Sequence, residues 1–263
     1  METMPQKECS ARPYDMTGQV ALVTGGGSGI GRAAAIRMAR AGASAVVIAG
    51  RRQPEGEAVA AECRAAGAQS LYVQTDVTQE GDVQRLIDTV LTQFGRLDAA
   101  FNNAGRQERR ASLHAQESAV YDAIFDANVR AVFLCLKYQL PPMAARGNGS
   151  IVINTSVSGV RNPNPGLALY SASKAAAISL MRSAAMEYAP HGVRINAIAP
   201  GRVVTDMMLS SGIADMSAVA AGLPLRRMGQ PEEVAEAVLW LLSGAASYVV
   251  GHVLAADGGF LAS

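Results

Sequence analysis

Short apolar runs alternate along the chain with longer stretches in which apolar residues recur at helical spacing. The runs are rich in Val and Ile and lack polar alternation, which is typical of strands buried on both faces of a parallel sheet. They predict strands over Val20–Thr24, Ala45–Ala49, Ser70–Thr75, Leu97–Asn102, Ser150–Thr155, Arg194–Ala199 and His252–Ala256. The stretches between them predict helices over Ile30–Ala41, Glu55–Ala66, Glu80–Phe94, Glu117–Tyr138, Ala168–Ala189 and Pro231–Ser243. Such alternation implies right-handed crossovers, so we expect an α/β fold with a doubly wound parallel sheet and helices on both faces.

Length and composition favour one globular domain. The chain has 263 residues, of which 49% are hydrophobic and 17% charged, and it contains no repeat or linker. We interpret the polar residues 1–15 as a flexible N-terminal extension and residues 16–263 as a single domain. No apolar run reaches the roughly 18 residues of a membrane span, and no segment is typical of a signal peptide. We therefore expect a cytoplasmic protein with no membrane partner.

Charge and cysteine content exclude several other classes of protein. The formal net charge of +1 argues against a nucleic-acid partner. Cys9, Cys63 and Cys135 are odd in number and widely spaced, which indicates free thiols in a reducing compartment and predicts neither a disulfide framework nor a metal site.

A glycine-rich turn follows the first predicted strand. It reads Thr24-Gly-Gly-Gly-Ser-Gly-Ile-Gly31 and runs directly into a predicted helix. Glycines let the main chain approach a ligand closely, and the helix N-terminus offers N–H groups to a pyrophosphate. The alternative is a purely structural tight turn. A nucleotide-triphosphate P-loop is excluded because no Gly-Lys-Ser/Thr follows.

Tyr170 and Lys174 stand four residues apart in a predicted helix, so both project from the same face. A free tyrosine has a pKa of about 10, and a nearby ammonium lowers it. The pair is therefore a candidate acid/base, although an exposed polar face has the same pattern. The overlapping Ser171-Ala-Ser-Lys174 matches the Ser-x-x-Lys of penicillin-binding enzymes, but their companion Ser-Asp-Asn and Lys-Thr-Gly motifs are missing from the sequence.

Taken together, these motifs resemble the short-chain dehydrogenase/reductase family over residues 18–260. The further motifs that carry the resemblance are Asp76-Val77, NNAG at Asn102–Gly105, Asn128 in DANVR, Ser156 in INTSVSG, NAIAPG ending at Gly201, Thr205, and DGG at Asp257–Gly259. The resemblance implies a Rossmann-like fold and an NAD(P)-dependent oxidoreductase that interconverts a ketone or aldehyde and an alcohol by hydride transfer. The four-residue Tyr–Lys spacing differs from that of the family's enoyl-reductase branch.

The family's roles carry over to the matching positions. The resemblance implies that Tyr170 is the acid/base, that Lys174 binds the nicotinamide ribose and lowers the tyrosine pKa, and that Ser156 holds the substrate oxygen. Asn128 would position a water molecule beside Lys174, or merely satisfy backbone groups. Ser156 lies one residue farther from Tyr170 than in many members, so Ser158 is the second candidate.

The resemblance also implies where the dinucleotide binds. The expected cofactor-binding residues are Gly25, Ser28, Gly29, Ile30, Gly31, Arg51, Arg52, Asp76, Val77, Asn103, Ala104, Gly105, Tyr170, Lys174, Pro200, Gly201, Val203 and Thr205. The second strand ends without a carboxylate, and a guanidinium there can grip a 2′-phosphate bidentately. This favours NADP(H), with NAD(H) as the alternative in which both arginines are only solvated charges.

Two other functions stay open. One is a reductase of 3-oxoacyl-[acyl-carrier-protein], for which Arg146 and His191 could dock an acidic carrier. The other is a dinucleotide-binding sensor without turnover, although such proteins tend to lose the catalytic set.

Assembly and substrate are predicted only in outline. The family resemblance suggests a homotetramer in which Glu117–Tyr138 and Ala168–Ala189 pair with symmetry mates, through apolar residues such as Val132, Leu136, Ile178 and Met181. Residues 205–229 occupy the family's substrate-loop position and are rich in Met and Leu. They predict a mobile cover for an apolar small-molecule substrate, or else a helix packed on the protein.

Overall fold

A computed structural model describes residues 14–162, 165–213 and 215–263, which form a seven-stranded parallel sheet. The strands are β1 (Val20–Thr24), β2 (Ala45–Gly50), β3 (Gln69–Gln74), β4 (Ala99–Asn102), β5 (Gly149–Asn154), β6 (Val193–Pro200) and β7 (Val253–Ala256). Their order is β3-β2-β1-β4-β5-β6-β7, and every neighbouring pair is parallel. The predicted doubly wound, Rossmann-like α/β fold is confirmed.

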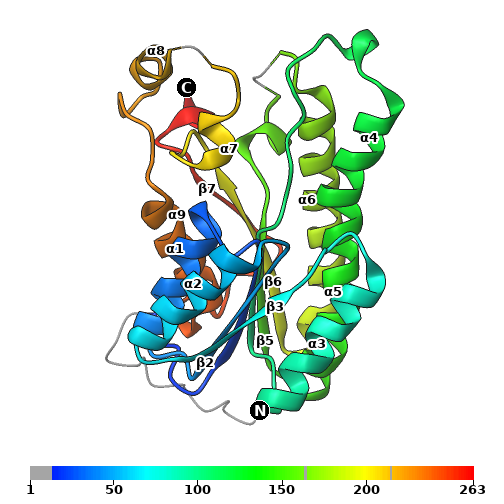
Figure 1. Cartoon of the computed structure of the whole chain (residues 1–263), viewed down its shortest axis with the longest axis vertical. Helices are drawn as coiled ribbons and strands as arrows, with labels where there is room; N and C mark the ends of the chain where they lie inside the picture. The colour runs from blue at the N-terminus through cyan, green and yellow to red at the C-terminus, as the bar shows by residue number, and fades with distance from the viewer. Residues whose placement is uncertain (1–13, 163–164, 214) are drawn as a thin grey trace, which may run out of the picture.

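Helices cover both faces of the sheet (Figure 1). On one face lie α1 (Gly29–Arg40), α2 (Gln53–Ala65) and α9 (Pro231–Leu242); on the other lie α3 (Glu80–Phe94), α4 (Ser118–Phe125), α5 (Ala131–Ala145) and α6 (Ala168–Tyr188). Two short helices, α7 (Asp206–Leu209) and α8 (Met216–Ala221), lie within the expected substrate loop.

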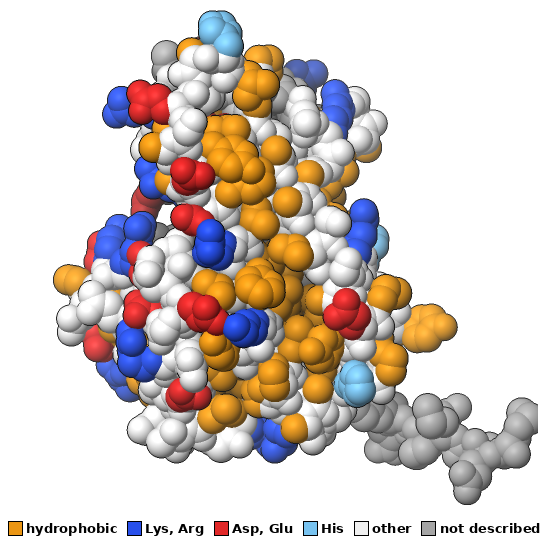
Figure 2. All heavy atoms as spheres, turned by 90° about the vertical axis from the view of Figure 1, so that its right-hand side faces the viewer, with side chains coloured by type: hydrophobic (Ala, Val, Ile, Leu, Met, Phe, Trp, Pro, Cys, Tyr) orange, Lys and Arg blue, Asp and Glu red, His pale blue; other side chains and the backbone are white. Residues whose placement is uncertain are grey.

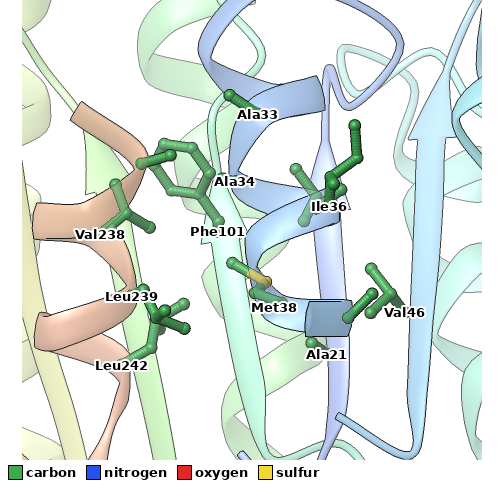
Figure 3. Close-up of a cluster of buried hydrophobic side chains, with 14 of the residues drawn as sticks. Ala21, Ala33, Ala34, Ile36, Met38, Val46, Phe101, Val238, Leu239 and Leu242 are labelled. Carbon is green, nitrogen blue, oxygen red and sulfur yellow. The ribbon is translucent and has the colours of Figure 1, made fainter. Parts of the chain in front are cut away.

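A separate hydrophobic core fills each interface between sheet and helices. In Figure 3 the Phe101 side chain of β4 lies between the small residues of α1 and the apolar face of α9. Phe101, Met38 and Val238 are completely buried there. Small alanines such as Ala34 allow α1 to approach the sheet and α9 closely, which fixes the helix that follows the glycine-rich turn.

The helical segment after Glu117 differs from its prediction. It contains a π-helical turn over Asp126–Arg130 and continues past Tyr138, through two prolines, to Ala145. Met143 in this last turn is fully buried, and a Cβ atom on Gly149 would lie 2.8 Å from its Cβ atom. Tertiary packing of Met143 therefore accompanies the extension of the helix beyond its predicted end at Tyr138.

The four apolar residues expected to mediate assembly are buried within the protomer, and Val132, Leu136 and Met181 belong to one of its hydrophobic cores. Val132, Leu136, Ile178 and Met181 are all buried, with exposed fractions of 0–5%. That assignment was wrong because periodicity alone does not distinguish which side of a helix meets the sheet.

The described part of the chain begins within the fold. Residues 1–13 of the expected extension, with Cys9, lie outside the described residues. Tyr14 already packs against the hydrophobic core, and Met16 is fully buried. Within the described ranges, no helix is long and apolar enough to cross a membrane.

Candidate active site

A cavity of about 520 Å³ lies at the carboxyl ends of the strands, where the strand order reverses between β1 and β4. Its walls include nearly every residue expected at the site. These are Gly25, Ser28, Gly29, Ile30, Arg51, Arg52, Asp76, Val77, Asn103, Ala104, Gly105, Ser156, Tyr170, Lys174, Pro200, Gly201, Val203 and Thr205. Residues from seven separate segments of the sequence thus converge on one hollow.

The glycine-rich turn is built by close backbone contacts. Gly25 has a φ of +62°, and a Cβ atom there would lie 3.0 Å from the Ala104 Cα atom. Gly31 does not line the cavity: a Cβ atom on it would lie 2.3 Å from the Gly25 carbonyl oxygen. The Asn103 amide donates to the carbonyl oxygens of Thr24 (3.1 Å) and Gly25 (3.0 Å). These contacts hold the turn so that the N-terminus of α1 faces the cavity.

Tyr170 and Lys174 lie on one face of α6, with the Lys174 Nζ atom 5.7 Å from the centre of the Tyr170 ring. The Ser156 and Tyr170 side chains are hydrogen-bonded. The Ser156 Oγ atom also accepts from the Ser158 backbone N–H at 3.1 Å, which orients the hydroxyl. Ser156, the first of the two serine candidates, therefore lies against the tyrosine.

Burial controls the proton affinities of this group. It raises the pKa of Tyr170 above its usual value of 10; the Ser156 hydrogen bond lowers that pKa, the Glu108 charge raises it and the Arg202 charge lowers it. Burial lowers the pKa of Lys174 to about 8. The expected net lowering of the tyrosine pKa is wrong for this structure, because desolvation of the phenolate outweighs the favourable charges.

Lys174 is also part of a chain of hydrogen bonds that reaches the glycine-rich turn. Its Nζ atom donates to the Asn154 carbonyl oxygen at 2.8 Å, and the Asn154 amide donates to the Asn103 Oδ1 atom at 2.8 Å. Asn103 in turn holds Gly25. The proton-transfer group and the glycine-rich turn are thus fixed relative to each other through Asn154, which the motif comparison had not assigned a role.

Asn128 lies in the π-helical turn and is 1% exposed. Its Oδ1 atom accepts from the Arg106 N–H at 2.8 Å, and its Nδ2 atom donates to the Arg106 carbonyl (2.8 Å) and the Ser173 Oγ atom (2.9 Å). Asn128 therefore braces the loop after β4 against α6. One oxygen lone pair is left over, so the water-holding role implied by the resemblance stays a prediction.

Glu108 is a site residue that sequence reasoning missed. Glu108 is only 6% exposed, and both of its carboxylate oxygens accept from the Tyr170 backbone N–H, at 3.0 and 3.1 Å. That N–H belongs to the first turn of α6 and has no partner within the helix. Because the two residues are 62 positions apart, no local pattern could reveal the contact.

The part of the cavity beside the end of β2 contains the two arginines that were expected to meet the adenosine side of the dinucleotide. Arg52 donates to the Ser28 Oγ atom at 3.0 Å and pairs with Glu55 at 3.0 Å. The Arg51 guanidinium makes no hydrogen bond or ion pair with any described residue. Asp76 accepts from the Thr78 N–H (3.0 Å) and hydroxyl (2.8 Å), which fixes its carboxylate beside the cavity.

The residues present fit a dinucleotide. A side chain at Gly25 would collide with Ala104, so the turn keeps its backbone bare beside the cavity. Asn154 lines the same cavity, and its buried Oδ1 atom has no hydrogen-bond partner among the described residues, which leaves an acceptor for a ligand donor. No group of metal-ligating side chains occurs among the described residues.

Comparison with known proteins decides the family. A family model described as Enoyl-(Acyl carrier protein) reductase matches residues 24–261. The A-factor type gamma-butyrolactone 1'-reductase (1S-forming) of Streptomyces virginiae is 42% identical over 248 residues, 93% of this chain and 96% of that protein. The chain belongs to the short-chain dehydrogenase/reductase family. Its motifs had predicted this membership.

Other members of the short-chain dehydrogenase/reductase family agree with the reaction class. A 3-oxoacyl-[acyl-carrier-protein] reductase of Synechocystis is 39% identical and covers 94% of this chain and 98% of its own length. The structure titled 7 alpha-hydroxysteroid dehydrogenase complexed with NADH and 7-oxo glycochenodeoxycholic acid has a TM-score of 0.89 and 33% identity, covering 94% of this chain and 96% of that chain.

The chain is therefore an NAD(P)-dependent oxidoreductase that interconverts a carbonyl compound and an alcohol. The description of the family model names enoyl reduction. The two relatives are instead named as reductases of a gamma-butyrolactone and of a 3-oxoacyl group, in agreement with the carbonyl chemistry expected from the Tyr170–Lys174 spacing.

Proposed function

We propose that this enzyme is an NADP(H)-preferring reductase of a medium-sized, largely apolar ketone, or a dehydrogenase of the corresponding secondary alcohol. The observation that carries the proposal is the hydrogen-bonded Ser156–Tyr170 pair, which lies beside buried Lys174 in the same cavity as the glycine-rich turn. A bound nicotinamide supplies or accepts the hydride. The chain's own residues hold the substrate oxygen and move the proton.

Each side chain has a separate task in this scheme. Tyr170 donates its phenolic proton to the carbonyl oxygen in reduction, or accepts the alcohol proton in oxidation. Ser156 donates a hydrogen bond to the same oxygen and aligns it with Tyr170. Lys174 is held by the Asn154 carbonyl beside the tyrosine, where its ammonium stabilises the phenolate and can bind the ribose hydroxyls.

Removal of the phenolic proton tests the mechanism. In Tyr170→Phe, turnover should fall by roughly a hundred- to ten-thousandfold, the usual contribution of a positioned acid/base, while the melting temperature and the cofactor dissociation constant stay near wild type. The assay is a spectrophotometric screen of ketones and alcohols with both cofactors, combined with cofactor binding by fluorescence. Retained turnover in the variant would exclude Tyr170 as the acid/base.

Preference for NADP(H) rests on Arg51. Its exposed side chain follows β2 at the adenosine end of the cavity and is not engaged by any described residue, whereas Arg52 is held by Ser28 and Glu55. A 2′-phosphate at this position would meet a guanidinium and no carboxylate of β2. NAD(H) is the alternative, in which both arginines are only solvated surface charges.

The apolar character of the substrate rests on the segment over residues 205–229. Met207 and Met208 of α7 line the cavity, and Met207 is 39% exposed. The Thr205 Oγ1 atom accepts from the Met208 N–H at 3.3 Å and thereby starts this helix next to the cofactor-binding residues. Closure of α7 over a bound ketone would bury these methionines and exclude water from the reacting carbonyl.

Docking of an acyl carrier has less support. Arg146 follows α5 and His191 precedes β6, so both lie at the amino ends of the strands. The cavity is at the opposite, carboxyl edge of the sheet. The two residues suggested for a carrier are therefore unsuited to guide it to Tyr170.

A dinucleotide-binding sensor without turnover also has less support, because such a protein does not need the Ser156–Tyr170–Lys174 group.

The proposed enzyme is a homotetramer and is located in the cytoplasm. Figure 2 shows a band of hydrophobic side chains on the face of the molecule that includes α4 and α5. Exposed hydrophobic residues of these two helices are Phe133 (51%) and Tyr121 (46%), whose ring stacks on Phe125. Burial of this band between subunits would remove apolar surface from water. Light scattering at micromolar concentration should give four times the chain mass.

The cysteines support the cytoplasmic location. Cys63 and Cys135 are buried and form no disulfide, as suits a reducing compartment.

A further inference from the structure

Side-chain amides join the carboxyl ends of three neighbouring strands. The strands β1, β4 and β5 are consecutive in the sheet; Asn103 directly follows β4, and Asn154 is the last residue of β5. The Asn154 Nδ2 atom donates to the Asn103 Oδ1 atom at 2.8 Å. The Asn103 Nδ2 atom in turn donates to the carbonyl oxygens of Thr24 and Gly25. A continuous set of hydrogen bonds therefore runs from β5, across β4, to the glycine-rich turn that follows β1.

Asn103 fixes the direction of these bonds. Its amide nitrogen faces two carbonyl oxygens, which only accept hydrogen bonds, so its amide oxygen must face Asn154. Asn154 must then present an N–H group to that oxygen. An apolar side chain or a carboxylate at position 154 cannot donate, and the Asn103 oxygen would lose this partner. The contact thus depends on the amide of Asn154 and not merely on the volume of its side chain.

The Asn103 amide is packed tightly inside the turn that it holds. A Cβ atom on Gly31 would lie 2.5 Å from the Asn103 Nδ2 atom, and a Cβ atom on Gly25 would lie 3.0 Å from it. The Asn103 backbone is tied to the same place, since its N–H donates to the Thr24 Oγ1 atom at 3.0 Å. Because both glycines approach this amide so closely, a rotation of the amide would displace the backbone at Gly25, which lines the cavity.

The backbone of Asn154 is held independently of its side chain. The next residue, Thr155, donates both its N–H (2.8 Å) and its hydroxyl (2.7 Å) to the Ile198 carbonyl oxygen of β6. Lys174 is bonded to the Asn154 backbone carbonyl oxygen, which any residue at this position would supply. Loss of the Asn154 amide should therefore leave Lys174 in place and affect the glycine-rich turn alone.

We propose that Asn154 is a positioning residue for the dinucleotide: its amide orients Asn103, and Asn103 holds the glycine-rich turn in the conformation that binds the cofactor. The inference rests on the proposed function, which places the dinucleotide at this turn. It assigns part of the cofactor affinity to β5, the strand that leads to Ser156, while the Asn154 side chain takes no part in proton transfer. Asn154 therefore acts through Asn103 and not by touching the ligand.

The experiment is a double-mutant cycle on the dissociation constants of NADPH and NADH, measured by fluorescence titration. Asn154→Ala should raise both constants roughly three- to tenfold, the usual worth of one buried hydrogen bond, while kcat at saturating cofactor stays near wild type. Asn103→Ala should raise them as well. In the Asn103→Ala background, Asn154→Ala should have no further effect, because the residue through which it acts is already gone.

The matched control is Asn196→Ala in the neighbouring strand β6. Asn196 is completely buried, and its Nδ2 atom donates to the Val249 carbonyl oxygen at 2.8 Å, remote from the glycine-rich turn. Its loss should lower the melting temperature and leave both dissociation constants unchanged. Hydrogen exchange of the backbone amides over residues 24–31, measured without cofactor, should accelerate in Asn154→Ala and not in Asn196→Ala.

Unchanged dissociation constants or unchanged exchange in Asn154→Ala overturn the inference. An equal effect of Asn154→Ala in the wild-type and Asn103→Ala backgrounds overturns it too, since Asn154 would then touch the ligand itself. Should Asn154→Ala fail to fold, Asn154→Leu decides, because it fills the space of the side chain without supplying a donor. A wild-type protein that binds neither dinucleotide refutes the proposed function, whereas normal binding that ignores Asn154→Ala refutes the inference alone.

Discussion

Glu108 offers the sharpest separation of structural from electrostatic effects in this active site. Its buried carboxylate accepts from the Tyr170 N–H in the first turn of α6, and its charge raises the pKa of the Tyr170 phenol. The same side chain therefore holds the acid/base in place and opposes its ionisation. Two substitutions at this position distinguish the two effects.

Glu108→Ala removes the acceptor and leaves a backbone N–H without its partner. Such a loss costs about 1–3 kcal/mol. For a chain of this size each kcal/mol corresponds to roughly 2–4 °C, so the melting temperature should fall by roughly 2–12 °C. Turnover should fall as well, because the start of the helix that carries Tyr170 and Lys174 is no longer tied to the loop after β4.

Glu108→Gln keeps an oxygen acceptor for the Tyr170 N–H and removes the negative charge. Its melting temperature should stay close to wild type. The phenolate, no longer opposed by the carboxylate, forms at lower pH, so the rise of alcohol oxidation with pH should shift to lower pH. Glu117→Gln, an exposed carboxylate just before α4, is the matched control and should leave the profile in place.

The measurement is kcat/KM for alcohol oxidation from neutral to alkaline pH, together with thermal unfolding. If the Glu108→Gln profile coincides with that of wild type, the proposed electrostatic coupling to Tyr170 is wrong. If Glu108→Ala unfolds at the wild-type temperature, the carboxylate does not stabilise the start of α6.

Three further outcomes follow from the site. Arg51→Ala should raise the NADPH dissociation constant roughly ten- to a hundredfold and change that of NADH far less, with Arg40→Ala as an exposed control; equal effects on both cofactors would show that Arg51 does not bind a phosphate. In wild type, kcat/KM should increase with apolar bulk across a series of ketones, and the double variant Met207→Ser/Met208→Ser should flatten this increase. The same increase in the variant would exclude α7 as an apolar cover of the substrate. Because burial lowers the pKa of Lys174 to about 8, its ammonium is present below that pH and lost above it. Carbonyl reduction should therefore decline as pH rises through about 8, and the variant Lys174→Arg should move the decline to higher pH; a decline at the same pH in both would remove Lys174 as its cause.

Local periodicity determined much of this protein. Each predicted strand and most helices lie within two residues of their expected ends, because a buried parallel strand and an amphipathic helix each leave a short-range pattern. The glycine-rich turn and the Tyr170–Lys174 pair were also visible, since spacing along one turn or one helix fixes which side chains can meet. Ser156 was identified as the first serine candidate by its place in the order of motifs.

Only tertiary structure decided how these groups behave. Burial, not the neighbouring lysine, sets the direction of the Tyr170 pKa shift, and burial depends on elements that are distant in sequence. Glu108 reaches Tyr170 across 62 residues, and Arg202 lines the cavity because β6 ends beside Gly229 and Ala256. The orientation of α5 likewise put Val132 inside and left Phe133 exposed. Such contacts arise from the packing of whole helices on the sheet, whose free energy is shared among many residues, so no short stretch of sequence carries their signature.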